Sequence, residues 1–181
     1  MKVTPTAIPE VLIVEPKVYG DERGFFYESF NARQFGECTG QHAVFVQDDH
    51  LRSARDVVRG LHYQVGLPQA KLVRVIAGVI LAVVVDLRSQ SPFFGRWVSV
   101  TLSAENRRQL WVPAGFAYGS VVTSEFAECL IKSTDYWTPH NERTIMWNDP
   151  ALAIEWPLRG AAVVSAKDNQ GTALADAEVF R

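Results

Sequence analysis

Short apolar runs rich in valine, isoleucine and aromatic residues recur along the chain, and this pattern limits the fold more than any other feature. Glycine, proline, aspartate or serine separates one run from the next, as is typical of strands joined by turns. The pattern predicts an all-β fold, an antiparallel β-sandwich or jelly roll. The runs are 11–14, 43–46, 72–76, 79–85, 97–102, 109–112, 120–123 and 126–131.

The run at 79–85 is uniformly apolar, so we expect it in the middle of the sandwich. Helical signals are sparse. Asn31 before ARQFGE predicts one short helix with Asn31 as its N-cap, and SAENRRQL predicts a further helical turn after Ser103. No repeat, low-complexity tract or linker divides the 181 residues, so we expect a single domain spanning 1–181.

Charge and cysteine content limit the possible partners. The 18 basic and 20 acidic residues give a formal charge of −2, unlike the basic footprint of a nucleic-acid-binding protein. The two cysteines, Cys38 and Cys129, do not form the spacing of a zinc site or a disulfide framework. We expect no nucleic acid partner and a reducing, cytoplasmic environment.

The N-terminal segment and the longest apolar stretch bear on export and membranes. Pro5 and Pro9 interrupt the first apolar run, which is unlike a signal peptide. The stretch at 73–85 contains Arg74 and is too short to span a bilayer as a helix. We therefore expect neither export nor membrane insertion.

The first candidate for chemistry is RGLHYQ at 59–64. If this segment is a strand, Arg59 and Tyr63 face one side and His62 faces the other. A histidine is easily poised as a base near neutral pH, but a lone histidine is more often structural. The segment alone leaves both interpretations open.

Two further segments contribute charged residues. Lys71 opens the apolar run in LPQAKLVRV, where its ammonium is either solvated or enters a cavity with its stem packed on apolar neighbours. The segment SAKD places Asp168 beside Lys167 in the C-terminal tail. Taken alone, it indicates a surface turn.

The segment DERGFFYESF at 21–30 admits two interpretations. Arg23 could offer a planar fork to a phosphate, with Phe25 and Phe26 as apolar walls. Alternatively, the segment is a β-hairpin with turn residues before Gly24 and alternating core and surface positions after it.

Jelly-roll proteins of the cupin type often bind a metal through two histidines two residues apart. The four histidines here lie at His42, His50, His62 and His140, and no two have that spacing. We expect no metal site of this kind.

Ordered motifs over almost the whole length resemble the dTDP-4-dehydrorhamnose 3,5-epimerase family, metal-free cupin jelly-roll enzymes of deoxysugar biosynthesis. The resemblance implies epimerisation of a nucleotide-diphosphate-linked 4-keto-6-deoxy sugar at C3, C5 or both, with no cofactor. The motifs are IPEVLIVEPKVYGDERGFFYESF, RGLHYQ, QAKLVRVIAGVI, WVPAGFAYG, STDYW, WNDPALAIEWP and SAKDNQGTALADAEVF.

The resemblance implies a catalytic set in which His62 is the base, Asp168 orients it and Lys71 lies next to the carbonyl oxygen. A proton beside a ketone is a very weak acid, so its removal needs a positioned base and a cation where negative charge develops on oxygen. A carboxylate fixes the tautomer of a catalytic histidine and stabilises its protonated form.

The resemblance also implies a substrate-binding set and a homodimer. Trp137 is available to stack on the nucleotide base, and arginines suit the diphosphate. In related enzymes Arg23 and Tyr19 reach the site of the neighbouring subunit. The expected substrate-binding residues are Arg23, Phe26, Glu28, Gln47, Asp49, Arg59, Trp137, Glu142 and Lys167.

Three positions depart from the family pattern. Ile131 stands where the family has a proton-donating tyrosine, Tyr118 stands where it has a histidine, and Asp49 replaces an asparagine. Three hypotheses follow. Tyr118 supplies the missing phenol as a fourth catalytic residue; or the enzyme inverts one carbon, or acts on a different nucleotide sugar; or the protein binds sugar nucleotides without turning them over.

Overall fold

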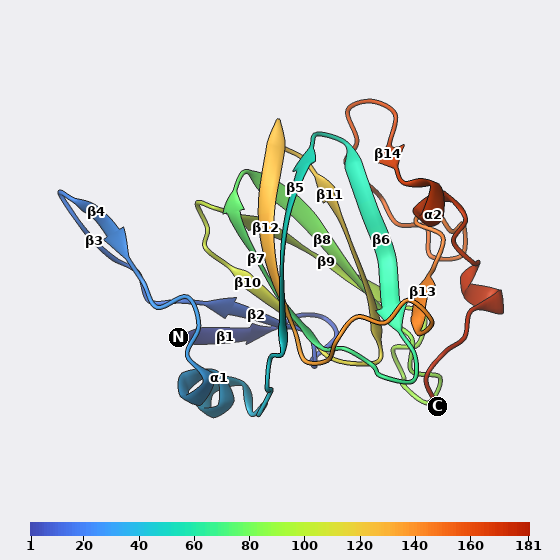
Figure 1. Cartoon of the computed structure of the whole chain (residues 1–181), viewed down its shortest axis with the longest axis horizontal. Coiled ribbons are helices and arrows are strands. Elements are labelled where there is room, and N and C mark those ends of the chain that lie inside the picture. Colours follow the sequence, from blue (N-terminus) through green and yellow to red (C-terminus); the bar gives the residue numbers. More distant parts are fainter.

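Two stacked β-sheets form the body of the protein, and the computed structural model describes residues 1–181 (Figure 1). We call the sheet that carries Lys71 the lysine sheet and the one that carries His62 the histidine sheet. The lysine sheet has the order β1 (Lys2–Pro5), β2 (Leu12–Glu15), β10 (Gln109–Val112), β7 (Lys71–Ala77), β12 (Phe126–Ser133) and β5 (Gln47–Ala54).

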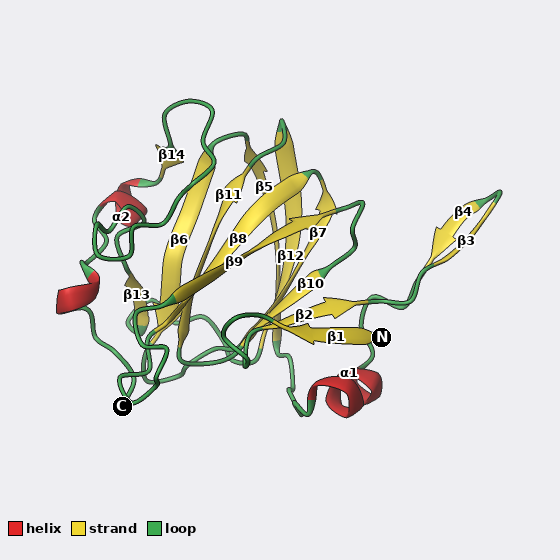
Figure 2. Ribbon diagram, turned by 180° about the vertical axis from the view of Figure 1, so that it is seen from behind, coloured by secondary structure: helices red, strands yellow, loops and turns green.

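The histidine sheet has the order β13 (Glu142–Thr144), β6 (Val57–Gln64), β11 (Phe116–Val122), β8 (Val79–Asp86) and β9 (Trp97–Ser103). The strand pairs in both sheets are antiparallel, except that β14 (Val163–Val164) pairs in parallel with β6. The predicted all-β jelly roll is confirmed (Figure 2).

Little of the chain is helical. Helix α1 (Ala32–Thr39) begins after Asn31, whose side chain accepts a hydrogen bond from the Gln34 amide at 3.1 Å, so the predicted N-cap is confirmed. The short helix α2 (Ala166–Asn169) and the 3₁₀ helix η1 (Leu174–Asp176) lie in the C-terminal tail. No helix has the length and apolar character that a membrane crossing requires.

Three local predictions were wrong or incomplete. The run at 43–46 is not a strand, because Phe45 instead joins an aromatic cluster with Phe35 and Trp111. The segment after Ser103 forms a turn closed by the Asn106 amide on the Ser103 hydroxyl at 2.9 Å, not a helix. Strand β5 was missed because its sequence, QDDHLRSA, is polar.

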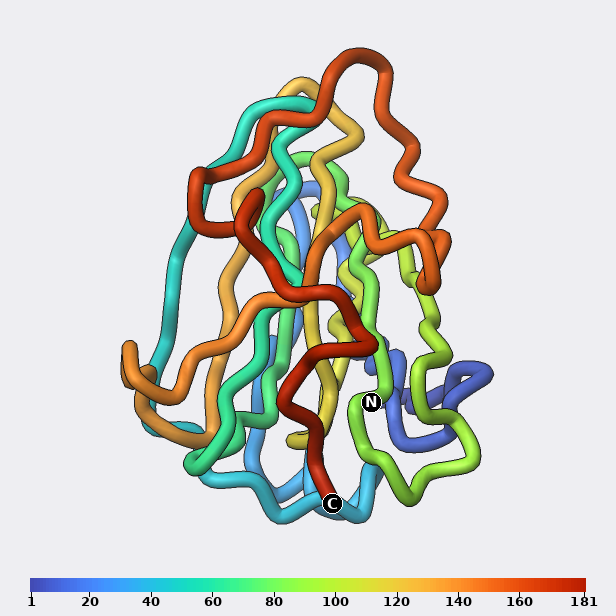
Figure 3. The backbone as a smooth tube through the Cα atoms, turned by 90° about the vertical axis from the view of Figure 1, so that its right-hand side faces the viewer, coloured from blue at the N-terminus to red at the C-terminus, as the bar shows by residue number.

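Apolar residues gather in three layers. The largest cluster lies between the sheets and includes Val73, Val84 and Leu110. A second covers the outer face of the lysine sheet beneath Phe35 of α1. A third lies on the outer face of the histidine sheet, beneath the C-terminal segment coloured orange to red in Figure 3 and including Ile145.

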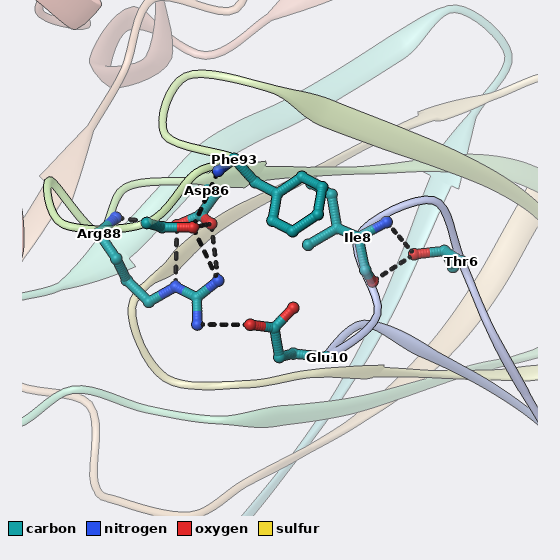
Figure 4. A network of polar contacts seen from close by, with 7 residues as sticks. Thr6, Ile8, Glu10, Asp86, Arg88 and Phe93 are labelled. Carbon is teal, nitrogen blue, oxygen red and sulfur yellow. Dashed lines mark hydrogen bonds and ion pairs between the residues drawn. The ribbon is translucent and has the colours of Figure 1, made fainter.

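A polar network around Arg88 fastens the β1–β2 loop to the end of β8 (Figure 4). Arg88 Nε and Nη2 donate to the fully buried Asp86 at 2.9 and 2.7 Å, and Nη1 donates to Glu10 at 3.0 Å. Burial opposes ionisation of Asp86, but hydrogen bonds from Arg88 and Ser91 outweigh it and lower the pKa of this carboxyl. Beside this network, Ile8 and Phe93 close the inter-sheet space with apolar side chains.

A hairpin of β3 (Tyr19–Asp21) and β4 (Gly24–Phe26) extends away from the body (Figure 1). The predicted hairpin is confirmed, but the predicted alternation of core and surface positions is wrong, because every residue of both strands is exposed. The hairpin touches the body through Phe25, whose ring lies 4.3 Å from the Arg107 guanidinium.

Candidate active site

A cavity of about 460 Å³ lies between the two sheets, within the size range of small-molecule sites. It collects eight of the residues expected from the sequence: Gln47, Asp49, Arg59, His62, Lys71, Tyr118, Trp137 and Glu142. Ile131 also lines it. Tyr63 of the RGLHYQ segment lines it as well, and no sequence signal pointed to the four remaining lining residues, Leu51, Gln64, Gln69 and Ser120.

The lysine-sheet wall becomes less polar with distance from Lys71. Directly opposed residues on neighbouring strands face the same side of a sheet, so the strand register arranges this wall in rows. The first row is Gln47, Ser133 and Lys71; the second is Asp49, Ile131 and Val73; the third is Leu51, Cys129 and Val75.

The histidine-sheet wall is shaped by a β-bulge in β6. His62 lies opposite Tyr118 and Arg59 lies opposite Ser120, so two residues of β6 face the single residue Gly119 of β11. Such a bulge shifts the alternation of side chains. Arg59 and His62 therefore face the same cavity, and the predicted opposition between them is wrong.

Glycine is required at the bulge. Gly60 has a φ of 110°, and a Cβ there would lie 2.6 Å from the Tyr118 carbonyl oxygen. A Cβ on Gly119 would lie 2.8 Å from Leu61 Cδ2. Any larger residue at either position would push the two strands apart.

His62 and Asp168 are in direct contact. His62 Nε2 lies 2.6 Å from Asp168 Oδ1, and the Gly60 amide donates to Asp168 Oδ2 at 3.2 Å. Burial opposes ionisation of Asp168, but the His62 hydrogen bond, with support from Gly60 and Lys167, lowers its pKa. The surface turn predicted from SAKD alone holds for Ser165–Lys167, which are exposed, but is wrong for Asp168, which is the buried residue of α2.

Lys71 enters the cavity from the first residue of β7. Its ammonium donates to Gln69 Oε1 at 2.9 Å. Burial lowers the pKa of Lys71, whereas the negative charges of Asp49 and Glu142 act to raise it. Of the two alternatives for this lysine, the structure supports entry into the cavity over solvation.

Tyr118 extends from the histidine sheet into the inter-sheet core, where Cys129 and Ile131 of the lysine sheet belong to the same apolar cluster. Burial, with a smaller effect of Cys129, raises the pKa of the Tyr118 phenol. The phenol therefore keeps its proton at neutral pH while lining the cavity.

Trp137 and Glu142 line another part of the cavity. The Trp137 amide donates to Gln47 Oε1 at 2.9 Å, and the Trp137 side chain remains half exposed. Glu142 accepts a hydrogen bond from Lys167 at 2.8 Å. Burial opposes ionisation of Glu142, but hydrogen bonds from Lys167 and Trp137 lower its pKa.

Four expected binding residues do not line the cavity of their own chain, and one of them, Lys167, reaches it only through its ion pair with the lining residue Glu142. Arg23 donates to Asp21 within the hairpin, and the Phe26 side chain is largely exposed. Glu28 accepts a hydrogen bond from Asn31 at 3.0 Å. The structure contains no group of three or more His, Cys, Asp or Glu side chains that could hold a metal ion.

Comparison with known proteins identifies the family. The family model for dTDP-4-dehydrorhamnose 3,5-epimerase matches residues 5–176. The dTDP-4-dehydrorhamnose 3,5-epimerase of Pseudomonas aeruginosa is 58% identical over 180 residues, which cover 99% of each chain.

Solved structures agree with this assignment. The dTDP-6-deoxy-D-glucose-3,5-epimerase of Legionella pneumophila, in complex with dTDP-4-keto-L-rhamnose, gives a TM-score of 0.97 at 48% identity, covering 99% of this chain and 97% of that one. A 3'-monoepimerase of Streptomyces bikiniensis, in complex with dTDP-quinovose, gives a TM-score of 0.89 at 30% identity, covering 97% and 88%. The chain belongs to the dTDP-4-dehydrorhamnose 3,5-epimerase family of isomerases.

Proposed function

We propose that this protein converts dTDP-4-dehydro-6-deoxyglucose to dTDP-4-dehydrorhamnose by removing and returning protons next to the C4 ketone. The observation that carries the proposal is the contact between His62 and Asp168 in a cavity that also contains Lys71. A positioned base and a cation near the carbonyl oxygen are the groups that enolate formation requires.

Deprotonation is assigned to His62. Asp168 accepts a hydrogen bond from the N–H of His62 Nε2, which leaves the lone pair on Nδ1 free to take a proton from the carbon beside the ketone. The electron pair of the broken C–H bond then moves onto the ketone oxygen. The Lys71 ammonium stabilises this enolate oxygen, and Asp168 stabilises the imidazolium.

Return of a proton to the opposite face of the enolate is assigned to Tyr118. Ile131 has no proton to donate, whereas the Tyr118 phenol extends toward Ile131 and Cys129 and stays protonated because burial raises its pKa. When the enolate collapses to the ketone, the carbon takes the phenol proton and leaves a tyrosinate that solvent must reprotonate.

Inversion of one carbon, or action on a different nucleotide sugar, is the second candidate. The specific observation in its favour is Ile131, because an apolar side chain on the wall opposite His62 removes one possible donor. The monoepimerase of Streptomyces bikiniensis shares the fold at a TM-score of 0.89.

Substrate binding is assigned to two regions. In the chain's own cavity, Trp137 offers its half-exposed indole to the base, and Arg59 and Gln47 offer donors to the polar groups. Lys167, which pairs with the lining residue Glu142, offers a further donor beside the cavity. The exposed hairpin, with Arg23 and Phe26, would complete the site of a partner subunit in a cytoplasmic homodimer.

Turnover of dTDP-4-dehydro-6-deoxyglucose in deuterated water tests the reaction. Each epimerised carbon gains deuterium, so we expect NMR of the product to find label at both C3 and C5. Label at one carbon would replace the proposal with the single-carbon reaction. Binding of dTDP without any exchange would contradict both and leave a sugar-nucleotide-binding protein. The substrate incubated without protein measures the background exchange.

Mixing two inactive variants tests the dimer. If the partner's Arg23 serves each site, a hybrid of His62→Asn and Arg23→Ala subunits contains one site with both residues intact. We therefore expect activity to return on mixing and subunit exchange. Two variants that remain inactive after verified exchange would contradict the shared site.

A further inference from the structure

Helix α2 holds Asp168 between two segments that are fixed to the strands around His62. Before the helix, Val164 pairs in parallel with β6, the strand of His62. After it, Thr172 forms a parallel bridge with Ile145, just beyond β13. Both ends of the turn are therefore tied to the histidine sheet, and the conformation of the turn itself decides where the Asp168 carboxylate lies.

Ser165 closes this turn. Its hydroxyl accepts a hydrogen bond from the Asp168 amide at 3.1 Å, and its carbonyl accepts one from the Asn169 amide at 3.0 Å. A helix of four residues has few internal hydrogen bonds, so its N-cap accounts for a large share of its order. Ser165 is exposed and does not line the cavity, so it is not placed to touch a substrate.

We infer that Ser165 is a positioning residue for the proposed reaction, and this inference rests on the proposed role of His62. The Asp168 carboxylate meets His62 Nε2 at 2.6 Å with one oxygen and the Gly60 amide at 3.2 Å with the other. Both contacts can be kept only if the Asp168 backbone is fixed. The Ser165 hydroxyl fixes that backbone at its amide.

Because Lys167 lies in the same turn, it allows an effect of losing the Ser165 hydroxyl on catalysis to be separated from an effect on substrate binding. It precedes Asp168 in the same turn but has its own ion pair with Glu142 at 2.8 Å. Loss of the Ser165 cap therefore loosens the Asp168 carboxylate more than it loosens the Lys167 ammonium, which is assigned to substrate binding. The expected signature is a fall in kcat with little change in dTDP affinity.

The experiment compares removal of two N-caps in the same chain. In Ser165→Ala we expect kcat for solvent exchange at the sugar carbons to fall roughly tenfold, because small displacements of catalytic groups are costly. KM and the Kd of dTDP should stay within about twofold, a free-energy change below 0.5 kcal/mol. Ser165→Thr, which keeps the hydroxyl, should restore kcat.

Asn31→Ala is the matched control, because Asn31 caps α1 through an equivalent hydrogen bond of 3.1 Å to the Gln34 amide. It should lower thermal stability without lowering kcat. If Ser165→Ala does not fold, Ser165→Gly removes the hydroxyl while retaining a residue that N-caps tolerate.

An unchanged kcat in a folded Ser165→Ala or Ser165→Gly protein would overturn the inference and leave the proposed function intact. A decrease that Ser165→Thr fails to restore, or that Asn31→Ala reproduces, would also overturn it. Absence of exchange in the unmodified protein would overturn the inference together with the proposed function.

Discussion

The space between the sheets is divided into a closed part and an open part. In the closed part, β8, β9 and β10 meet with apolar side chains such as Ile80, Val100 and Leu110. In the open part, β5, β12, β6 and β11 surround the cavity with polar groups such as His62 and Asp49. The same two sheets thus provide a packed core on one side and a binding cavity on the other.

Single strands contribute to both parts. Strand β7 begins with Lys71 in the cavity and continues inward with Val73 and Val75 in the core. A strand fixed by its apolar half holds its polar end in place, which is how a rigid element fixes a catalytic group. The buried network around Arg88 closes the β8 end of the interior, so changes there should affect stability and changes in the cavity should affect chemistry.

The largest expected effect is loss of the base in the open part. In His62→Asn we expect solvent exchange of the substrate to fall by roughly 10³-fold, because general-base catalysis is lost, while dTDP binding is retained. His50→Asn is the control, since His50 forms a comparable contact with Glu128 at 3.2 Å on an exposed surface. Equal losses in the two variants would contradict the assignment of the base.

The next effect is on stability, in the closed part. Arg88→Met removes the guanidinium that lies over the Phe116 ring and leaves Asp86 buried without its charged partner, which should lower the free energy of unfolding by about 3 kcal/mol. Arg108→Met removes the more exposed pair with Glu15 and should cost at most about 1 kcal/mol. Urea unfolding measures both. Similar losses of unfolding free energy in the two variants would mean that burial does not determine how much each ion pair stabilises the fold.

The pH dependence of stability tests the same network. Because the pKa of Asp86 is lowered in the folded protein, its stabilisation is present above the unfolded pKa of about 3.9 and is lost as pH falls through the folded pKa. The gap in unfolding free energy between the unmodified protein and Arg88→Met should therefore narrow below about pH 4. If this gap in unfolding free energy did not change with pH, Asp86 would not stabilise the fold as the charged partner of Arg88.

A smaller effect is expected for the acid assigned to Tyr118. Tyr118→Phe should lower the rate of inversion by roughly 10²-fold. Label should still enter the unepimerised substrate, because His62 can return deuterium to the face from which it took the proton. Tyr27→Phe is the control, since Tyr27 stacks on Phe25 and does not line the cavity. Full inversion by Tyr118→Phe would reject this role.

The smallest effect is a shift in pH dependence from Asp49. Its negative charge acts to raise the pKa of Lys71, against burial and together with Glu142. In Asp49→Asn the pKa of Lys71 should fall further, so the alkaline limb of kcat/KM should move to lower pH. Asp48→Asn is the control, because Asp48 pairs with Lys132 at 2.9 Å on an exposed surface. A shift to higher pH would contradict the assignment.

Local sequence signals were sufficient to predict a helix or strand where one physical requirement determines its structure. The run at 109–112 coincides with β10, whose four residues are all buried in a strand that lies between β2 and β7. Asn31 marked the start of α1 through its capping side chain. The polar strand β5 gave no such signal, because an edge strand needs only one neighbour and can expose its side chains.

The sequence by itself determined the all-β class, the N-cap of α1 and, through ordered motifs, the family and a short set of charged candidates. Only the tertiary structure decided how those candidates meet. The bulge at Gly60 turns Arg59 to the same side as His62, and the turn capped by Ser165 buries Asp168 against it. Both depend on contacts between segments far apart in the chain, which local periodicity does not encode.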